Sequence, residues 1–511
     1  MDNYNQNAKG GARVQASLCD RQIVTELSSD FTLPDYQPEI KRLLRVRATV
    51  LPPDKYIGAS TADFSGTVDY TVLYCGNDGA LYCTAQSEEY HFSAPLEMGA
   101  DIEVGEGLVC DVDTVTDMAV GRVVAPRKVS LKCRMRSRVR LWGSKILEES
   151  VHGGSATERL YGQVDCAKLF VGMGEPLSLM DEILFDAQNA EMRVICAEGQ
   201  VFVTEATAGS GTVNCRGEVA LKLLCADESG GGVTVQTRRI PFAQSVFVDG
   251  AEINCDAYAD GVCSDLRITV EDGRIVCETT VLLRAHAQRN ESVTYTRDLY
   301  STSAVCENTY TQSVFPLAVK CINGNVSVNT TLSLEEVGLR SGASVVDISV
   351  NPLVVSVENE HGKYQLNGRC RCHVVYHDGE DLGAQEFEVP FRYETDGGAV
   401  AASDFDASVT PIACRARMDS ERIGVDAELA VCLGIRGENN IKRLSETKFG
   451  EEITRRGAVY TICYPSSDDT LWSVAKRYHR PVTDIAAMNS LAGSPAADSK
   501  DSLASVHYLL V

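Results

Sequence analysis

The stretch FSGTVDYTVLY (Phe64–Tyr74) has two counterparts further along the chain, NCRGEVALKLLC (Asn214–Cys225) and LNGRCRCHVVY (Leu366–Tyr376). In each copy, a glycine is followed by apolar residues at alternate positions, which a β-strand places on one buried face. The leading glycines are separated by the same interval of 151 residues: Gly66, Gly217 and Gly368. Two equal intervals of domain size predict a triplicated β-rich domain.

Two further features follow each glycine strand in the same order. The first is a short strand-like run with an aromatic residue: Phe92, Phe242 and Phe391. The second is an alternating strand led by a basic residue: Lys128, Arg274 and Arg422. The glycine at the start of each strand indicates a bulge or a close backbone approach. We therefore expect a mainly β fold with three tandem repeats, at residues 21–155, 156–305 and 306–447.

Length and charge restrict the class of protein. At 511 residues, the chain has room for three or four domains of about 150 residues each. Its 48 Lys and Arg residues against 71 Asp and Glu give a formal net charge of −23. An acidic surface repels phosphate backbones and anionic lipids, so we expect no nucleic-acid partner.

Cysteine usage and hydropathy point to a reducing compartment. The 19 cysteines show no paired spacing, and many occupy inward positions of alternating runs, where cysteine acts as a small apolar residue. The first residues lack the apolar core of a signal peptide, and no apolar run approaches the ~18 residues that a membrane span needs. We expect a cytoplasmic protein with free thiols, no transmembrane segment and a disordered polar tail at residues 1–20.

The end of the chain has a different pattern. Residues 437–457 are charged and contain three glycines, which predicts a linker, placed at 448–457 between the third repeat and the final domain. Residues 458–511 predict the order strand, helix, helix, strand. Asp468 or Asp469 can cap the first helix, and Thr483 the second. Their inward stripes are Leu471, Val474, Ala475 and Tyr478, then Ile485, Ala486 and Met488.

This C-terminal stretch resembles the LysM domain. The matching residues are Tyr460, Ile462, Asp469-Thr470-Leu471-Trp472, Val474-Ala475, Tyr478, Ile485 and Asn489. Asp468 replaces the turn glycine of the family, and the usual Pro-Gly-Gln before the last strand is missing. The resemblance implies a groove for glycans that contain N-acetylglucosamine, such as peptidoglycan.

The three upstream repeats resemble the SPOCS domain of sporulation proteins in endospore-forming bacteria. The residues that carry this likeness are the opening segment Leu33–Ile40, the Gly66 strand and the Phe92 strand. With a terminal LysM domain, the chain is similar to clostridial spore-coat morphogenetic proteins, which lie in the mother cell on the forespore surface. The resemblance implies that the LysM domain docks onto the coat-basement ATPase and tethers the coat.

Motifs of catalysis and metal binding are scarce. The sequence has no P-loop, no His-Glu-x-x-His and no Gly-x-Ser-x-Gly. Strand alternation places Cys370 and Cys372 on one face and His373 and His377 on the other, so one tetrahedral ion could not collect all four. We expect no metal, no cofactor and no enzymatic activity.

The predicted binding surface lies on the two rims of the LysM-like groove. The first rim is Asp468, Asp469, Thr470, Leu471 and Trp472, and the second, by family analogy, is Met488, Asn489 and Leu491. Trp472 lies one position off the apolar stripe, so it is either a core-edge residue or an exposed binding aromatic. We expect a non-catalytic adaptor of the spore coat, with possible self-association. The alternatives are a peptidoglycan-binding protein of the cell envelope and an enzyme within one repeat.

Overall fold

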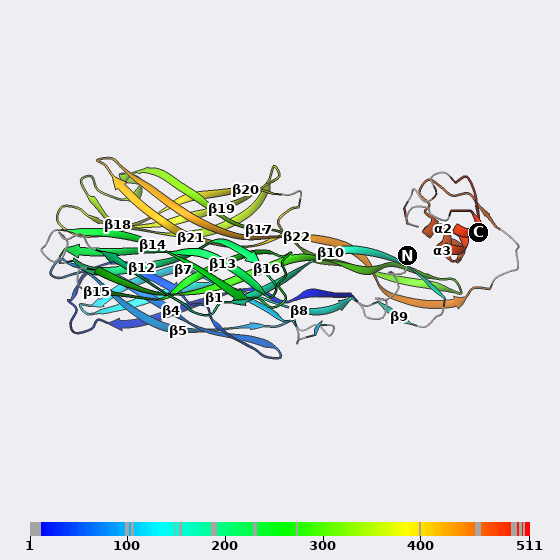
Figure 1. The fold of residues 1–511 in the computed structure, drawn as a ribbon, viewed down its shortest axis with the longest axis horizontal. Coiled ribbons are helices and arrows are strands. Elements are labelled where there is room, and N and C mark those ends of the chain that lie inside the picture. Colours follow the sequence, from blue (N-terminus) through cyan, green and yellow to red (C-terminus); the bar gives the residue numbers. More distant parts are fainter. Residues whose placement is uncertain are drawn as a thin grey trace.

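The chain folds into an elongated body of three β lobes and a small helical module at one end (Figure 1). The computed structural model describes residues 12–97, 102–103, 107–147, 149–152, 156–184, 192–227, 232–271, 274–397, 400–454, 461–491, 498–499, 503 and 506–511. Strands account for 77% of the chain, which confirms the mainly β prediction. Apart from one short turn, the helices lie near the C-terminus. Among the described residues, no helix has the length and apolarity to cross a membrane.

Lobe 1 is a pair of antiparallel sheets that face each other across a core. One sheet consists of β1 (Ala12–Thr32), β6 (Ile102–Glu103), β7 (Val109–Ala125) and β8 (Lys128–Leu147). The other consists of β2 (Ile40–Val50), β3 (Asp54–Ile57), β4 (Thr61–Gly76) and β5 (Leu81–Pro95). The first and last long strands, β1 and β8, are direct neighbours.

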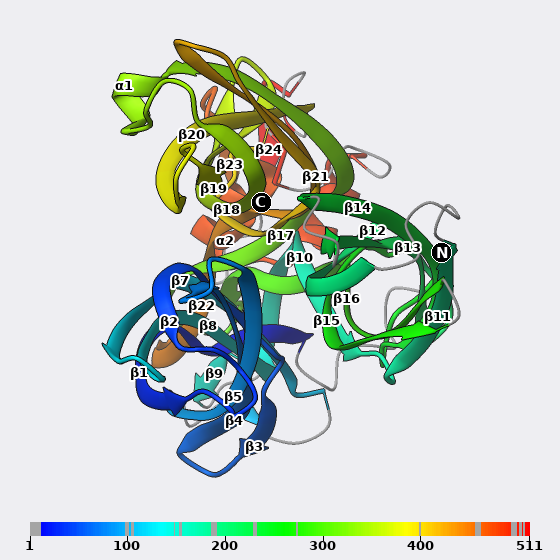
Figure 2. The ribbon, with the colours of Figure 1, turned by 90° about the vertical axis from the view of Figure 1, so that its left-hand side faces the viewer.

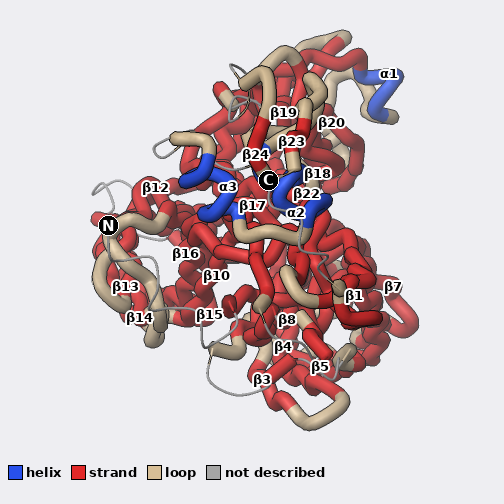
Figure 3. The backbone as a smooth tube through the Cα atoms, turned by 90° about the vertical axis from the view of Figure 1, so that its right-hand side faces the viewer, coloured by secondary structure: helices blue, strands red, loops and turns tan. Residues whose placement is uncertain are grey.

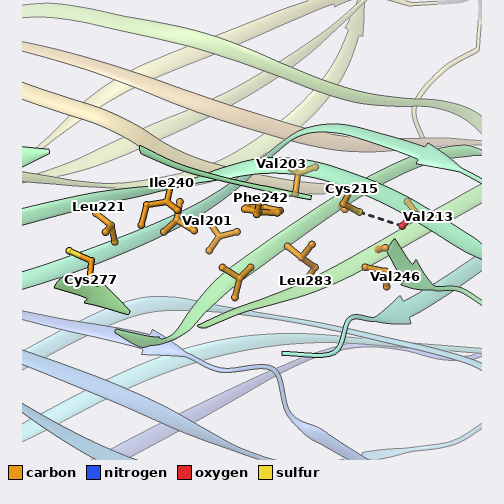
Figure 4. Packing of buried hydrophobic residues seen from close by; sticks show 14 of the residues in the cluster. Val201, Val203, Val213, Cys215, Leu221, Ile240, Phe242, Val246, Cys277 and Leu283 are labelled. Carbon is orange, nitrogen blue, oxygen red and sulfur yellow. Dashed lines mark hydrogen bonds between the residues drawn. The ribbon is translucent and has the colours of Figure 1, made fainter. Parts of the chain in front are cut away.

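Lobe 2 has the same pairing order. Its first sheet is β10 (Thr157–Met173), β11 (Leu177–Leu184), β15 (Asp256–Glu271) and β16 (Arg274–Ser301). Its second sheet is β12 (Met192–Ala208), β13 (Thr212–Asp227) and β14 (Val233–Phe247). Figure 4 shows the core between them, where Val201 and Phe242 of the second sheet lie near Leu283 of the first.

Lobe 3 repeats this arrangement with longer strands. One sheet is β17 (Ala304–Ser333), β21 (Asp404–Met418), β22 (Arg422–Glu452) and, parallel to β22, β9 (Ser150–His152). The other is β18 (Ser344–Glu360), β19 (Lys363–His377) and β20 (Leu382–Asp396). The single helical turn α1 (Leu334–Val337) follows β17 and is closed by a Ser333 capping box.

The three glycines occupy the same position in their sheets. Each lies on the middle strand of a sheet, opposite an aromatic residue of the next strand: Gly66 opposite Tyr90, Gly217 opposite Phe242 and Gly368 opposite Phe391. A Cβ at these glycines would lie 2.7, 2.6 and 2.3 Å from the respective ring. Glycine is needed because a side chain at this position would collide with the ring.

In lobe 1 the ring that covers the glycine is that of Tyr90, two residues before Phe92 on the same strand. Phe92 is opposite Phe64, and their ring centroids are 5.0 Å apart in a stacked pair. Tyr90 and Phe92 point to the same face of β5 because a strand has a period of two residues, and it is Tyr90 that covers Gly66.

The lobes surround a common axis when viewed along the length of the molecule (Figure 2). Leu73, Leu224 and Val375, on the middle strands of the three lobes and again 151 residues apart, belong to one buried cluster. Nearby, Arg45 of lobe 1 forms ion pairs with Glu198 of lobe 2 at 2.8 Å and with Asp347 of lobe 3 at 2.5 Å. These contacts join all three lobes.

Two strand pairs extend past the lobes as an arm toward the helical module (Figure 1). The arm consists of residues 157–164 paired with 293–301, and 304–312 paired with 442–452. The prediction of a linker at 437–457 is therefore wrong for residues 437–452, because these belong to β22. Residues 455–457 lie outside the described residues. The predicted disordered tail at 1–20 is also wrong for 12–20, which pair with β8.

Candidate functional site

The C-terminal module, residues 461–511, consists of β23 (Ile462–Cys463), α2 (Leu471–Tyr478), α3 (Val482–Met488) and β24 (Leu509–Leu510). This is the predicted order of elements. Cys463 and Leu509 are paired across the two-stranded sheet and face the helices. Figure 3 shows α2 and α3 over the centre of the molecule when it is viewed from this end. Tyr460 lies outside the described residues.

Thr470 and Asp469, which were predicted to be binding residues, instead stabilise the turn before α2. The N-cap of α2 is Thr470, which forms a capping box with Ser473, rather than Asp468 or Asp469. Asp469 is buried and accepts a hydrogen bond from the Ser466 backbone N–H at 2.9 Å. It also pairs with Arg477 at 2.5 Å. The Ser466 backbone hydrogen bond and the Arg477 pair lower the Asp469 pKa to about 2.

The second helix starts differently from the prediction. Pro481 precedes α3 with no side-chain cap, and Thr483 lies exposed inside the first turn. Ile485 is fully buried as predicted, but Met488 is 41% exposed. The physical reason is that α3 ends at Met488, so this side chain lies at the edge of the core rather than inside it.

Asn489 holds the end of α3 to the last strand. Its amide donates to the carbonyl oxygens of Ile485 and Leu510, both at 2.8 Å, and accepts from the Leu510 N–H at 2.8 Å. Its side chain therefore closes the module rather than standing free for a ligand. Leu491 is half-buried and packs against the module's core.

Trp472 is buried, at 7% exposed, because α2 is docked on the arm. Its indole Nε1 donates to Asp298 at 2.9 Å, and its ring meets Tyr300 edge-on at 4.9 Å between centroids. Lys476, one turn further on α2, forms an ion pair with the same Asp298 at 2.6 Å. Neither prediction for Trp472 included this partner, which lies 174 residues earlier in the chain.

Further polar contacts complete the docked face. Tyr300 donates to the Arg480 carbonyl at 2.7 Å, and a ring nitrogen of His479 lies 2.9 Å from the Ser301 carbonyl. Burial raises the Asp298 pKa, but the hydrogen bonds from Lys476, Tyr310 and Trp472 outweigh it and hold that pKa below its usual value. Asp298 is therefore a carboxylate at neutral pH, and it anchors the module.

Besides Met488, three large apolar side chains in the described part of the module are exposed, and none of them was predicted to be a binding residue. Ile462, Tyr464 and Tyr508 are 55%, 75% and 57% exposed. Alternation explains their position, because Cys463 and Leu509 between them face inward. The alternating run from Ile462 to Tyr464 is the signal that could have identified this face. Of the eight predicted site residues, only Asp468 and Met488 are classed as exposed.

Comparison with known proteins identifies the module. Residues 466–494 match the LysM domain, so the chain carries a LysM domain at its C-terminal end. No curated protein matches the chain. No solved structure matches it either. The resemblance of the three lobes to the SPOCS domain stays a prediction.

Elsewhere in the described chain, two groups of side chains contain potential metal ligands. Cys370 and Cys372 lie in the core of lobe 3, while His373 lines a cleft between lobes. Asp111, His286 and Asp406, one from each lobe, bring ligand atoms within 4.8 Å of one another. Guanidinium groups already neutralise these carboxylates: Arg140 pairs with both, and Arg436 with Asp406. This cluster fits an ionic junction between lobes.

Proposed function

We propose that this chain is a non-catalytic binding protein in which the three β lobes form a scaffold and the LysM domain holds a glycan. The ligand would contain N-acetylglucosamine, as peptidoglycan does. The LysM match carries this proposal, because glycan binding is the property that the domain suggests.

The docking of the domain is compatible with this role. The arm covers the Trp472 and Lys476 face of α2. Asp468 of the predicted first rim and Met488 of the second stay exposed, whereas Trp472, which also belongs to the predicted first rim, is covered by the arm. The domain is thus held by one face, while one residue of each predicted rim remains accessible to solvent.

Co-sedimentation of the full chain with purified peptidoglycan tests this function. Met488→Asp would place a charge on the groove rim, and we expect retention to fall by about tenfold, equivalent to about 1.4 kcal/mol. The matched control is Met180→Asp, at an exposed methionine of β11 in lobe 2. Equal loss in both variants, or no retention of the parent chain, would refute glycan binding.

A second candidate function is a protein-binding adaptor. The exposed face of Ile462, Tyr464 and Tyr508 favours it, because clustered aromatics are typical of protein interfaces. In this version the partner would be a spore-coat basement ATPase, and the chain would tether the coat at the forespore surface in the mother-cell cytoplasm. Several contact surfaces on one chain would turn modest affinities into stable attachment.

Co-purification with that ATPase distinguishes the second candidate from the first. Replacing Tyr464 and Tyr508 by serine should abolish capture of the partner without affecting peptidoglycan retention. The control replaces Tyr36 and Tyr56, two exposed tyrosines of lobe 1, by serine. Undiminished capture by the first variant would rule out this face as the adaptor surface.

A further inference from the structure

A large cleft lies where the three lobes meet. Its volume is about 800 Å³, within the range of small-molecule sites. All three lobes contribute to its walls, through β2, β7 and β8, then β12, β13 and β14, then β18, β19 and β21. The cleft is far from the LysM domain in sequence and shares none of its residues.

Among the residues that line the cleft, Lys and Arg outnumber Asp and Glu, which is the reverse of the whole chain. Nine Lys and Arg residues line it against five Asp and Glu, whereas the full sequence has 48 against 71. Low-dielectric walls focus the field of such residues and raise the local concentration of ions of opposite sign. An anion that the acidic outer surface repels would therefore be attracted here.

Two guanidinium groups of the cleft, those of Arg136 and Arg371, are held in place and keep donors available. Arg136 of lobe 1 pairs with Asp117 at 3.0 Å and is 38% exposed. Arg371 of lobe 3 pairs with Glu386 at 3.1 Å and donates to the Asp117 carbonyl at 2.7 Å. Each guanidinium has five N–H donors, so these contacts do not exhaust it.

Among the described cations that line the cleft, Arg415 is the one without a carboxylate partner. It lines the cleft from β21, is exposed, and has no ion-pair partner within the part of the chain that the structure describes. An arginine without a carboxylate partner, in a cleft lined by other arginines, can bind a phosphate or carboxylate group through two parallel hydrogen bonds.

We propose that this cleft binds a small polyanion bearing phosphate or carboxylate groups, contacted by cations of all three lobes. Arg239, whose side chain is 49% exposed, supplies the contribution of lobe 2. A bound polyanion would link the lobes to one another, and it would therefore raise the stability of the body as well as occupy the cleft. This inference is independent of the glycan and adaptor functions proposed for the LysM domain.

Titration calorimetry with the full chain tests the proposal, using tripolyphosphate in one arm and citrate in the other, with sodium chloride keeping the ionic strength constant. We expect saturable binding of at least one probe, and the arm that binds more tightly identifies phosphate or carboxylate as the ligand chemistry. The double variant Arg136→Gln, Arg415→Gln should bind it at least tenfold more weakly.

The control variant is Arg216→Gln, Arg267→Gln, which removes the same charge from two exposed arginines outside the cleft. It should bind as the parent chain does. The single variant Arg415→Gln, at an exposed residue, covers the case in which the double variant misfolds, and it too should bind more weakly. No binding of either probe, or equal binding by cleft and control variants, would overturn the proposal.

Discussion

Trp472 and Asp298 are joined by a hydrogen bond of 2.9 Å from the indole Nε1 to the carboxylate, although 174 residues separate them in the chain. Asp298 belongs to the arm that lobe 2 sends out, and Trp472 to the first helix of the LysM domain. Lys476 binds the same carboxylate, so one acidic side chain holds two residues of α2. The LysM domain is thus docked on the arm in a defined position.

We predict that Asp298→Ala releases the LysM domain from the arm. The substitution leaves the Trp472 N–H and the Lys476 ammonium without their acceptor, at a cost of about 1–3 kcal/mol. The chain has two tryptophans, so a Trp142→Phe background reports Trp472 alone. Its fluorescence should shift to the red in the variant. Asp484→Ala, at an exposed aspartate of α3, is the control and should leave the emission unchanged. An unshifted spectrum in Asp298→Ala would show that docking of the LysM domain does not depend on this carboxylate.

The docking should also weaken in acid. The Asp298 pKa is lower in the docked protein than its ordinary value of 3.8. A depressed carboxyl pKa contributes stability above the ordinary value, and that contribution is lost as the pH falls through the docked-state value. The same Trp472 fluorescence, followed from pH 7 downward, should stay constant to about pH 4 and shift only below it. A shift centred near pH 6 would assign the transition to another group.

Gly217→Ala should destabilise lobe 2. The added methyl group would lie 2.2 Å from the Phe202 carbonyl oxygen and 2.6 Å from the Phe242 ring, so the strand must move. Overpacking of this kind costs about 1–3 kcal/mol. Thermal unfolding should show a lower Tm than for Gly450→Ala, where the nearest atom is at 3.7 Å. Equal Tm values for the two variants would mean that the close approach is not needed.

Removing Asp347 should be among the most damaging changes in the body. Its carboxylate is 1% exposed and pairs with Arg45 of lobe 1 and Lys222 of lobe 2, each at 2.5 Å. Asp347→Ala would leave Lys222 without its carboxylate partner and Arg45 with Glu198 alone, and loss of one member of a buried pair costs about 3–5 kcal/mol. Denaturant unfolding checks this prediction. Glu97→Ala, which breaks an exposed pair with Arg21, should cost at most about 1 kcal/mol.

The same junction predicts acid sensitivity of the whole body. Burial raises the Glu198 pKa, but Arg45, Arg47 and Lys222 more than offset this and lower it to about 2, from an ordinary 4.5. The stabilisation is complete above pH 4.5 and is lost as the pH falls toward 2. Urea midpoints measured between pH 5 and pH 2 should therefore fall, and fall less in Glu198→Gln. Parallel curves for the two proteins would contradict the role of Glu198.

The local patterns of the sequence predicted much of the fold. The strands led by Lys128, Arg274 and Arg422 begin at those residues in the structure, as β8, β16 and β22. Alternation of apolar residues was sufficient because each strand has one face in a core. The LysM elements were predicted for the same reason, from the stripes of α2 and α3.

The arm and the docked face could not be predicted in this way. Residues 437–452 resemble a linker because a two-stranded ribbon in solvent has no continuous apolar face, yet Leu444 and Thr447 within it are buried. Trp472 was ambiguous because a single helix pattern cannot show a partner at Asp298. The junction residues Arg45 and Asp347 each follow a register shift in their strand, which alternation alone does not reveal.

The measurement that most directly tests binding by the LysM domain is co-sedimentation with purified peptidoglycan of the full chain and of a chain ending at residue 454. The full chain should pellet with the glycan, and the shortened chain should remain in the supernatant. Retention of the shortened chain, or failure of the full chain to pellet, would contradict the proposal.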